Sequence, residues 1–158
     1  MASTDVRVLV HNIRSAHNVG SIFRTADAFG IHRIYLSGYS PLPIDRFGFL
    51  QREIQKTALG AERNIPWENV SSPSRLIETL RREGFSIVGI EQDTRSVDYR
   101  EFRPSRRMLL LVGNEVRGIS SALRRRCDVL ISIPMRGKKE SLNVSVAFGV
   151  VVSRLIDG

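Results

Sequence analysis

The sequence predicts an α/β fold in which a parallel sheet is flanked by helices. Short apolar runs rich in branched residues alternate along the chain with segments whose apolar residues follow helical spacing. Several of the runs are apolar at every position, which is typical of strands buried on both faces of a sheet. Because 158 residues with 42% hydrophobic content can bury one proper core, we expect a single domain over residues 1–158.

The chain begins with a predicted strand, a helix and a second strand. Residues 6–11 alternate valine with other residues and follow a strand pattern. Residues 19–29 change to helical spacing, with apolar side chains at Val19, Ile22, Phe23, Ala26 and Phe29. Gly30 then fits the left-handed position that ends a helix. Residues 33–37 form the second predicted strand.

The middle of the chain is less regular. Residues 38–64 are interrupted by prolines and glycines, so we expect a loop around one short helix near residues 50–59. A clearer helix follows, because Ser72 and Pro73 supply a cap and a first-turn residue and Gly84 supplies the stop.

The second half resumes the alternation of strands and helices. Its predicted strands are residues 85–90, 108–113 and 129–134. Its predicted helices are residues 119–126 and 142–156. This order favours parallel strands joined by helical crossovers.

Polar segments follow three of the predicted strands, at residues 17–24, 113–118 and 133–143. Ligands of parallel α/β sheets bind beyond the carboxyl ends of the strands, so we expect these segments to converge. The second segment is not a nucleotide-triphosphate loop, because Ile119 stands where lysine is required and Glu115 would put negative charge in the phosphate cradle. No GxGxxG follows a predicted strand, which argues against a Rossmann dinucleotide site.

Charge predicts an anionic partner. The formal net charge is +8, and nearly all basic residues are arginine, whose planar guanidinium suits phosphate oxygens and stacks on bases. Nucleic acid is the natural candidate, although charge alone is equally compatible with a basic surface that binds nothing. Cys127 is the only cysteine, and the three histidines show no zinc-ligand spacing, so we expect neither an internal disulfide nor a metal.

The sequence also bears on location. No stretch approaches the roughly 18 consecutive apolar residues of a membrane span. Residues 1–5 do not begin a secretory leader. We therefore expect a cytoplasmic protein with no membrane partner.

Three segments resemble the signature motifs of the SpoU, or TrmH-like, branch of the SPOUT methyltransferases. They are HNVGSIFRTADAFG (residues 17–30), LLVGNEVRGIS (residues 110–120) and IPMRGKKESLNVSVA (residues 133–147), in the family's order. The resemblance covers nearly the whole catalytic domain. It implies methyl transfer from S-adenosylmethionine to a ribose 2′-hydroxyl in tRNA or rRNA. It also implies an α/β knot with a C-terminal trefoil, a homodimer, and no separate RNA-binding extension.

The resemblance also assigns roles to single residues. Arg24 matches the first motif's arginine, whose guanidinium would stabilise the alkoxide forming on the ribose. Arginine stays protonated, so we leave the acceptor of the ribose proton open. The other residues implied at the catalytic centre are Asn18, Glu115, Ser141 and Asn143. Those implied to hold the cofactor are Ile90, Gly113, Ile133, Ser141 and Leu142.

These residues also have structural interpretations. Arg24 could pair with Asp27 on the helix surface, and Asn18 could cap the helix before Val19. Ser141 and Asn143 could likewise cap the last helix. For Glu115 the alternative is an exposed carboxylate near Arg117.

Two other functions compete with methyl transfer. The first is a non-catalytic RNA-binding module on the same scaffold, against which the intact Arg24, Glu115, Ser141 and Asn143 argue. The second is a nucleotide-binding oxidoreductase of the doubly wound type, against which the missing glycine fingerprint argues.

Overall fold

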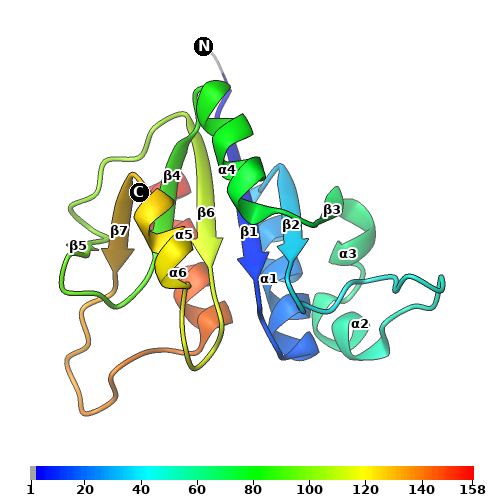
Figure 1. Cartoon of the computed structure of the whole chain (residues 1–158). Helices are drawn as coiled ribbons and strands as arrows, with labels where there is room; N and C mark the ends of the chain where they lie inside the picture. The colour runs from blue at the N-terminus through cyan, green and yellow to red at the C-terminus, as the bar shows by residue number, and fades with distance from the viewer. Residues whose placement is uncertain (1–2) are drawn as a thin grey trace.

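The computed structural model describes residues 3–158, which form a seven-stranded sheet in the order β3-β2-β1-β6-β4-β7-β5 (Figure 1). Every pair of neighbouring strands in it is parallel. The strands are β1 (Asp5–His11), β2 (Arg33–Ser37), β3 (Trp67–Val70), β4 (Ser86–Ile90), β5 (Val97–Asp98), β6 (Arg107–Val112) and β7 (Val129–Ser132). The predicted fold class is confirmed.

Helices cover both faces of the sheet, as Figure 1 shows. The helices are α1 (Ala16–Phe29), α2 (Arg52–Ala58), α3 (Ala61–Asn64), α4 (Pro73–Arg82), α5 (Ser121–Arg126) and α6 (Val144–Asp157). One hydrophobic cluster joins the sheet to α1, α2, α3 and α6, and a second joins the opposite face to α4 and α5. The five strands between the edge strands β3 and β5 are therefore covered on both sides, which explains their continuous apolar runs.

The central strand β1 shows how the sequence divides between the two clusters. Val6, Val8 and Val10 belong to the cluster under α1 and α6, whereas Leu9 belongs to the cluster under α4 and α5. Successive side chains of a strand point to opposite faces, so alternation by single residues fills both layers.

The sequence-based boundaries need several corrections. The first helix begins at Ala16 rather than Val19, because the Ser15 hydroxyl caps it by accepting from the backbone N–H of Asn18 at 3.2 Å. The prediction of a single short helix within residues 38–64 is wrong, because α3 follows α2 there. Strands β3 and β5 were not predicted, since runs of four and two residues carry too little periodicity to be recognised.

The chain connections that leave the neighbouring strands β1 and β6 run in opposite directions along the sheet. From β1 the chain continues to β2 on one side, and from β6 it continues through α5 to β7 on the other. The carboxyl ends of two strands whose connections diverge form the usual ligand site of an open α/β sheet. The C-terminal knot stays a prediction. Residues 1–2, part of the segment considered for a leader, lie outside the described residues.

Candidate active site

A pocket of about 350 Å³ opens at the carboxyl ends of β4, β6 and β7. It is lined by residues 90–92, 112–118, 132–133 and 140–142, together with Arg124, Val144 and Ala147. The second and third polar segments of the sequence thus meet at one edge of the sheet, as predicted.

The loop after β6 is a closed turn. The backbone of Asn114 and Gly118 is joined by two hydrogen bonds of 3.1 and 2.8 Å, and the Asn114 side chain accepts from the N–H groups of Val116 and Arg117. Gly113 is required here because a Cβ at that position would stand 2.5 Å from the backbone of Gly118. The loop therefore presents its backbone to the pocket in one fixed shape.

Glu115 ties this loop to the start of α1. Its carboxylate accepts hydrogen bonds from the backbone N–H of Arg14 at 2.9 Å, the backbone N–H of Ser15 at 2.8 Å and the side-chain amide of Asn18 at 3.1 Å. Burial acts to raise the pKa of this carboxyl group, but the donors from Arg14 and Ser15 outweigh it and hold the pKa below its ordinary value. Ionised Glu115 therefore joins the loop after β6 to the segment that leads from β1 into α1.

Asn18 extends the bridge to α6. The Asn143 side-chain amide donates to the side-chain oxygen of Asn18 at 3.1 Å. The Asn143 oxygen also accepts from the backbone N–H of Ser145 at 2.9 Å and from that of Val146, so it caps α6. Glu115, Asn18 and Asn143 form one chain of hydrogen bonds that joins the three predicted motifs.

The predicted cofactor residues all line the pocket: Ile90, Gly113, Ile133, Ser141 and Leu142. Gly113 is buried, whereas Ser141 and Leu142 are exposed at the mouth. They come from the end of β4, the loop after β6 and the loop between β7 and α6, so the arrangement offers a ligand both apolar side chains and backbone groups.

Of the purely structural interpretations of Asn18, Glu115 and Asn143, the structure rejects two and confirms one. Asn18 is not the cap of α1, because Ser15 occupies that position. Glu115 binds the start of α1 and not Arg117, so the interpretation as a free exposed carboxylate is wrong. Asn143 does cap the last helix, and this role coexists with its contact to Asn18.

Arg24 is the one predicted catalytic residue that the fold does not bring to the others. Its side chain is exposed on α1 and does not line the pocket. Within residues 3–158 it has neither an ion pair nor a side-chain hydrogen bond, so the alternative pairing with Asp27 does not form.

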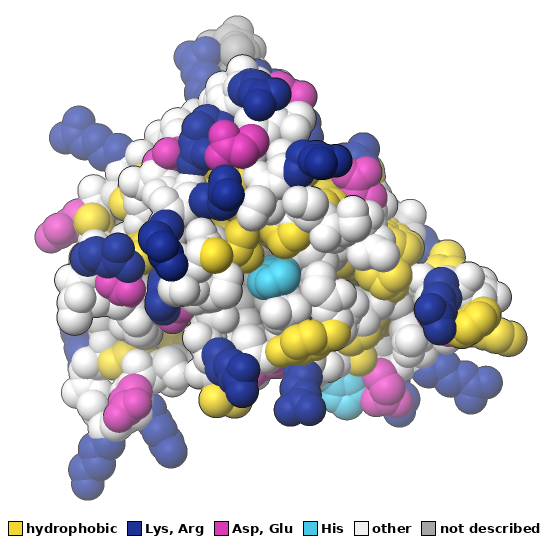
Figure 2. Space-filling model, in the orientation of Figure 1, with side chains coloured by type: hydrophobic (Ala, Val, Ile, Leu, Met, Phe, Trp, Pro, Cys, Tyr) yellow, Lys and Arg dark blue, Asp and Glu magenta, His cyan; other side chains and the backbone are white. Residues whose placement is uncertain are grey.

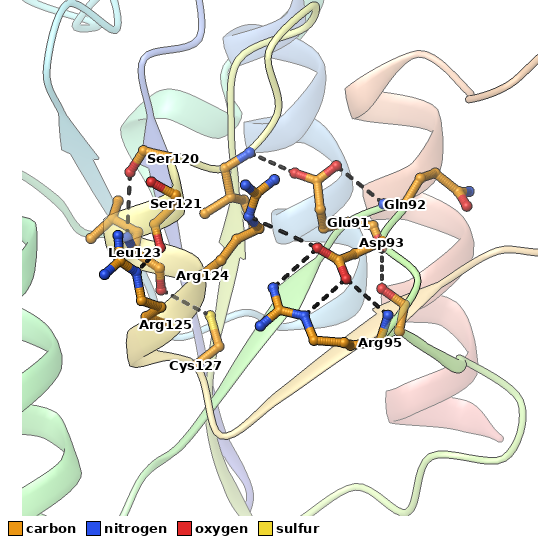
Figure 3. Close-up of polar contacts among 12 residues, drawn as sticks. Glu91, Gln92, Asp93, Arg95, Ser120, Ser121, Leu123, Arg124, Arg125 and Cys127 are labelled. Atoms are coloured by element: carbon orange, nitrogen blue, oxygen red, sulfur yellow. Dashed lines mark hydrogen bonds and ion pairs between the residues drawn. The ribbon is translucent and has the colours of Figure 1, made fainter.

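A polar group at the end of β4, shown in Figure 3, was not predicted from the sequence. Glu91 accepts hydrogen bonds from the backbone N–H of Ile119 at 2.6 Å and that of Gln92 at 3.1 Å. Asp93 faces Arg124 at 4.0 Å, and hydrogen bonds from Arg95 lower the pKa of Asp93 to about 2. One signal was available, because Glu91 directly follows a buried strand next to the predicted Ile90.

The net charge of the side chains that line the pocket is opposite in sign to the net charge of the whole protein. Three carboxylates line it, from Glu91, Glu115 and Glu140, and two guanidinium groups, from Arg117 and Arg124. The chain carries +8, so this local excess of acid disfavours a polyphosphate and suits a ligand with positive charge. Over the described part of the chain, no cluster of His, Cys, Asp and Glu could hold a metal ion, and no helix is long and apolar enough to cross a membrane.

Comparison with known proteins decides the family. Residues 5–153 match the model of the SpoU rRNA Methylase family. The chain belongs to the SpoU rRNA methylase family. A curated SpoU relative, the 23S rRNA (guanosine-2′-O-)-methyltransferase RlmB of Neisseria meningitidis, is 34% identical over 146 residues, which is 92% of this chain and 56% of RlmB. The chain thus spans about half the length of the curated relatives it matches.

Solved SpoU structures share the fold. The TrmH/SpoU tRNA modifying enzyme of A. aeolicus has a TM-score of 0.85 at 29% identity, over 98% of this chain and 75% of that one. The SpoU methyltransferase AviRb of Streptomyces viridochromogenes, in complex with the cofactor AdoMet, has a TM-score of 0.86 at 29% identity, over 99% of this chain and 61% of that one.

Proposed function

We propose that this SpoU protein transfers a methyl group from S-adenosylmethionine to a ribose 2′-hydroxyl of tRNA or rRNA. The observation that carries the proposal is the pocket at the ends of β4, β6 and β7, joined to α1 by Glu115, Asn18 and Asn143. The names of RlmB and of AdoMet-bound AviRb support the reaction and the cofactor.

The pocket fits the cofactor in size and in chemistry. A volume of about 350 Å³ lies within the usual range of small-molecule sites, roughly 300–1,000 Å³. Ile90, Ile133 and Leu142 provide apolar surface for the adenine, while the backbone at Gly113 and the hydroxyl of Ser141 provide polar contacts. The excess of carboxylates suits a sulfonium, which is a cation.

Bound S-adenosylmethionine supplies a methyl group on a positively charged sulfur. As the bond between the methyl carbon and sulfur breaks, S-adenosylhomocysteine would leave with its electron pair, the ribose 2′-oxygen would bond to the methyl carbon, and the hydroxyl proton would pass to solvent. The Arg24 guanidinium stabilises the negative charge that develops on the oxygen, which is the largest single effect in many such sites. Asn18 and Asn143 orient the ribose, and Glu115 holds Asn18 in place.

A homodimer completes the site. Arg24 lies six residues beyond Asn18 on α1, about 9 Å along the helix axis, and outside the pocket lining. Arg24 of a second copy therefore serves the pocket. Leu142 and Val146 support this arrangement, because these large apolar side chains beside the pocket remain 38% and 51% exposed in one chain.

RNA is the partner that the surface favours. Figure 2 shows lysine and arginine side chains spread over the visible face, with fewer acidic ones between them. Arg136, Lys138 and Lys139 are exposed on the loop before α6, beside the pocket lining, where they can contact backbone phosphates. A protein that methylates such RNA works in the cytoplasm.

Calorimetry and RNA mapping test the proposal together. S-adenosylmethionine and S-adenosylhomocysteine should bind, whereas ATP and NAD should not. New 2′-O-methyl positions should appear in total RNA treated with the protein and cofactor. Binding of RNA without any methyl transfer would favour the non-catalytic RNA-binding module, and binding of NAD alone would favour the oxidoreductase.

A further inference from the structure

Glu91 contributes to the negative charge of the pocket, but neither the family motifs nor the proposed catalytic steps assign it a contact of its own. It is the first residue after β4, and its backbone is fixed on both sides. Its N–H donates to the carbonyl of Ile131 at 3.0 Å, and its carbonyl accepts from the Ser96 hydroxyl at 2.6 Å. The side chain therefore projects from a rigid point on the pocket wall.

The two carboxylate oxygens of Glu91 are also fixed. Oε2 accepts from the N–H of Ile119 at 2.6 Å, and Oε1 accepts from the N–H of Gln92 at 3.1 Å (Figure 3). A Cβ on Gly118 would stand 2.2 Å from Oε2, so only glycine leaves room for this position. A carboxylate has about four acceptor sites, and among residues 3–158 each oxygen of Glu91 receives one of these donors, which leaves each oxygen able to accept another.

We propose that Glu91 recognises the ribose of the cofactor by accepting hydrogen bonds from its 2′- and 3′-hydroxyl groups. Two fixed acceptors side by side match a pair of hydroxyls on neighbouring carbons. An acidic residue at a strand end plays the equivalent part in dinucleotide-binding α/β folds of unrelated sequence. The inference rests on the proposed function, because it presupposes an adenosine ligand.

The other polar parts of the cofactor fit Glu91 less well. The carboxylate of the methionine portion would be repelled by it. The sulfonium must face the acceptor ribose, on the side of the pocket where Asn18 and Asn143 meet. Within the described residues, Glu91 has no hydrogen bond to that network, and its polar neighbours belong to the β4 and α5 side.

This role predicts discrimination between ribose and deoxyribose ligands. A site built to bind a hydroxyl rejects the analogue that lacks it, because the buried acceptor is left without a donor. Hydrogen bonds to charged groups are strong enough for a difference of about tenfold or more per hydroxyl.

Calorimetry on the intact protein tests the inference by crossing protein variants with ligand variants. The ligands are S-adenosylhomocysteine and its 2′-deoxy and 3′-deoxy analogues, bound to wild type, Glu91→Gln and Glu140→Gln. Glu140→Gln is the matched control, since it removes the same charge from the pocket lining at an exposed position. We expect wild type and Glu140→Gln to bind each deoxy analogue at least about tenfold more weakly than S-adenosylhomocysteine. In Glu91→Gln this ratio of dissociation constants should fall below about threefold.

A uniform loss of affinity for all three ligands in Glu91→Gln, with the ratio unchanged, would overturn the inference and leave Glu91 as a support for the loop before Ile119. If Glu91→Gln has a lowered melting temperature, Glu91→Asp takes its place. A carboxylate withdrawn by one methylene should also lose the discrimination between S-adenosylhomocysteine and its deoxy analogues. Wild type that binds S-adenosylhomocysteine and its deoxy analogues equally contradicts the inference alone. Wild type that binds none of them contradicts the proposed function as well.

Discussion

The first turn of α1 and its middle differ in a way that bears on how the protein works. At the beginning of the helix, Asn18 is joined to Glu115 and Asn143 by hydrogen bonds within one chain. Further along the same helix, Arg24 is exposed and does not line the pocket. The hydrogen bonds of Asn18 are made within a single chain, whereas Arg24 is free to contact a second molecule.

The largest effect is expected at Arg24. Arg24→Ala should lower the single-turnover rate of methyl transfer by about two to three orders of magnitude, because a charge contact made in the transition state is lost. Arg24→Lys should restore little, since an ammonium lacks the planar fork of guanidinium. Calorimetry should show unchanged cofactor affinity. A folded Arg24→Ala protein with the wild-type rate would remove Arg24 from the active site.

Mixing variants tests whether Arg24 acts across a dimer. Gly113→Ala should damage the pocket, because the added Cβ meets the backbone of Gly118. Arg24→Ala damages only the catalytic contact. If the two subunits share each site, re-assembled mixtures of the inactive variants should recover about a quarter of wild-type activity, the share of intact sites expected from random dimers. Sedimentation should show a dimer, and a fully active monomer would exclude the arrangement.

A medium effect is expected at Glu115, which binds the start of α1. Glu115→Gln keeps the size of the side chain but weakens the acceptor for Arg14, Ser15 and Asn18. We expect a loss of about 1–3 kcal/mol in the free energy of unfolding together with a slower reaction. Chemical denaturation measures the free energy of unfolding. Unchanged stability would show that Glu115 does not hold the loop after β6 against the start of α1.

The same carboxylate predicts a pH dependence. The pKa of Glu115 is lower in the folded chain than its ordinary value, so its contribution to stability is present above that ordinary value of about 4.5 and is lost as pH falls through the folded pKa. The difference in the free energy of unfolding between wild type and Glu115→Gln should therefore shrink as the pH is lowered into the acid range. Parallel melting curves from neutral pH downward would reveal it, and a constant difference would contradict the assignment.

The smallest effect is expected at Asp27. Asp27→Ala should change the free energy of unfolding by less than about 0.5 kcal/mol and leave the methylation rate intact, since no ion pair joins Asp27 to Arg24. A loss of activity comparable to that of Arg24→Ala would mean that the pair forms in solution and matters.

Much of the fold could be predicted because its signals are local. The alternating valines of β1 and the left-handed Gly30, with φ of 71°, each express their structure within a few residues. The two-residue β5 and four-residue α3 could not be predicted, because segments so short complete no period. Their formation depends on neighbours that are distant in the sequence.

Part of the candidate site could also be predicted from the sequence. The motif resemblance identified Gly113 and Asn143, whose positions the pocket and the helix cap explain. Glu91 was missed because a single acid after a strand has no distinctive spacing, and only the fold shows that its carboxylate meets the N–H of Ile119. For Arg24, the resemblance supplied a role without saying in which chain's pocket it acts.

Alkaline hydrolysis of labelled RNA tests the proposed reaction most directly. Methyl-labelled S-adenosylmethionine is incubated with unmodified RNA and the protein, and the RNA is then cleaved with alkali, which requires a free 2′-hydroxyl. We expect the label in alkali-resistant dinucleotides, and we expect Arg24→Ala to slow its appearance there by about two to three orders of magnitude. Label recovered only in single nucleotides would mean that a base is methylated, and it would contradict transfer to the ribose.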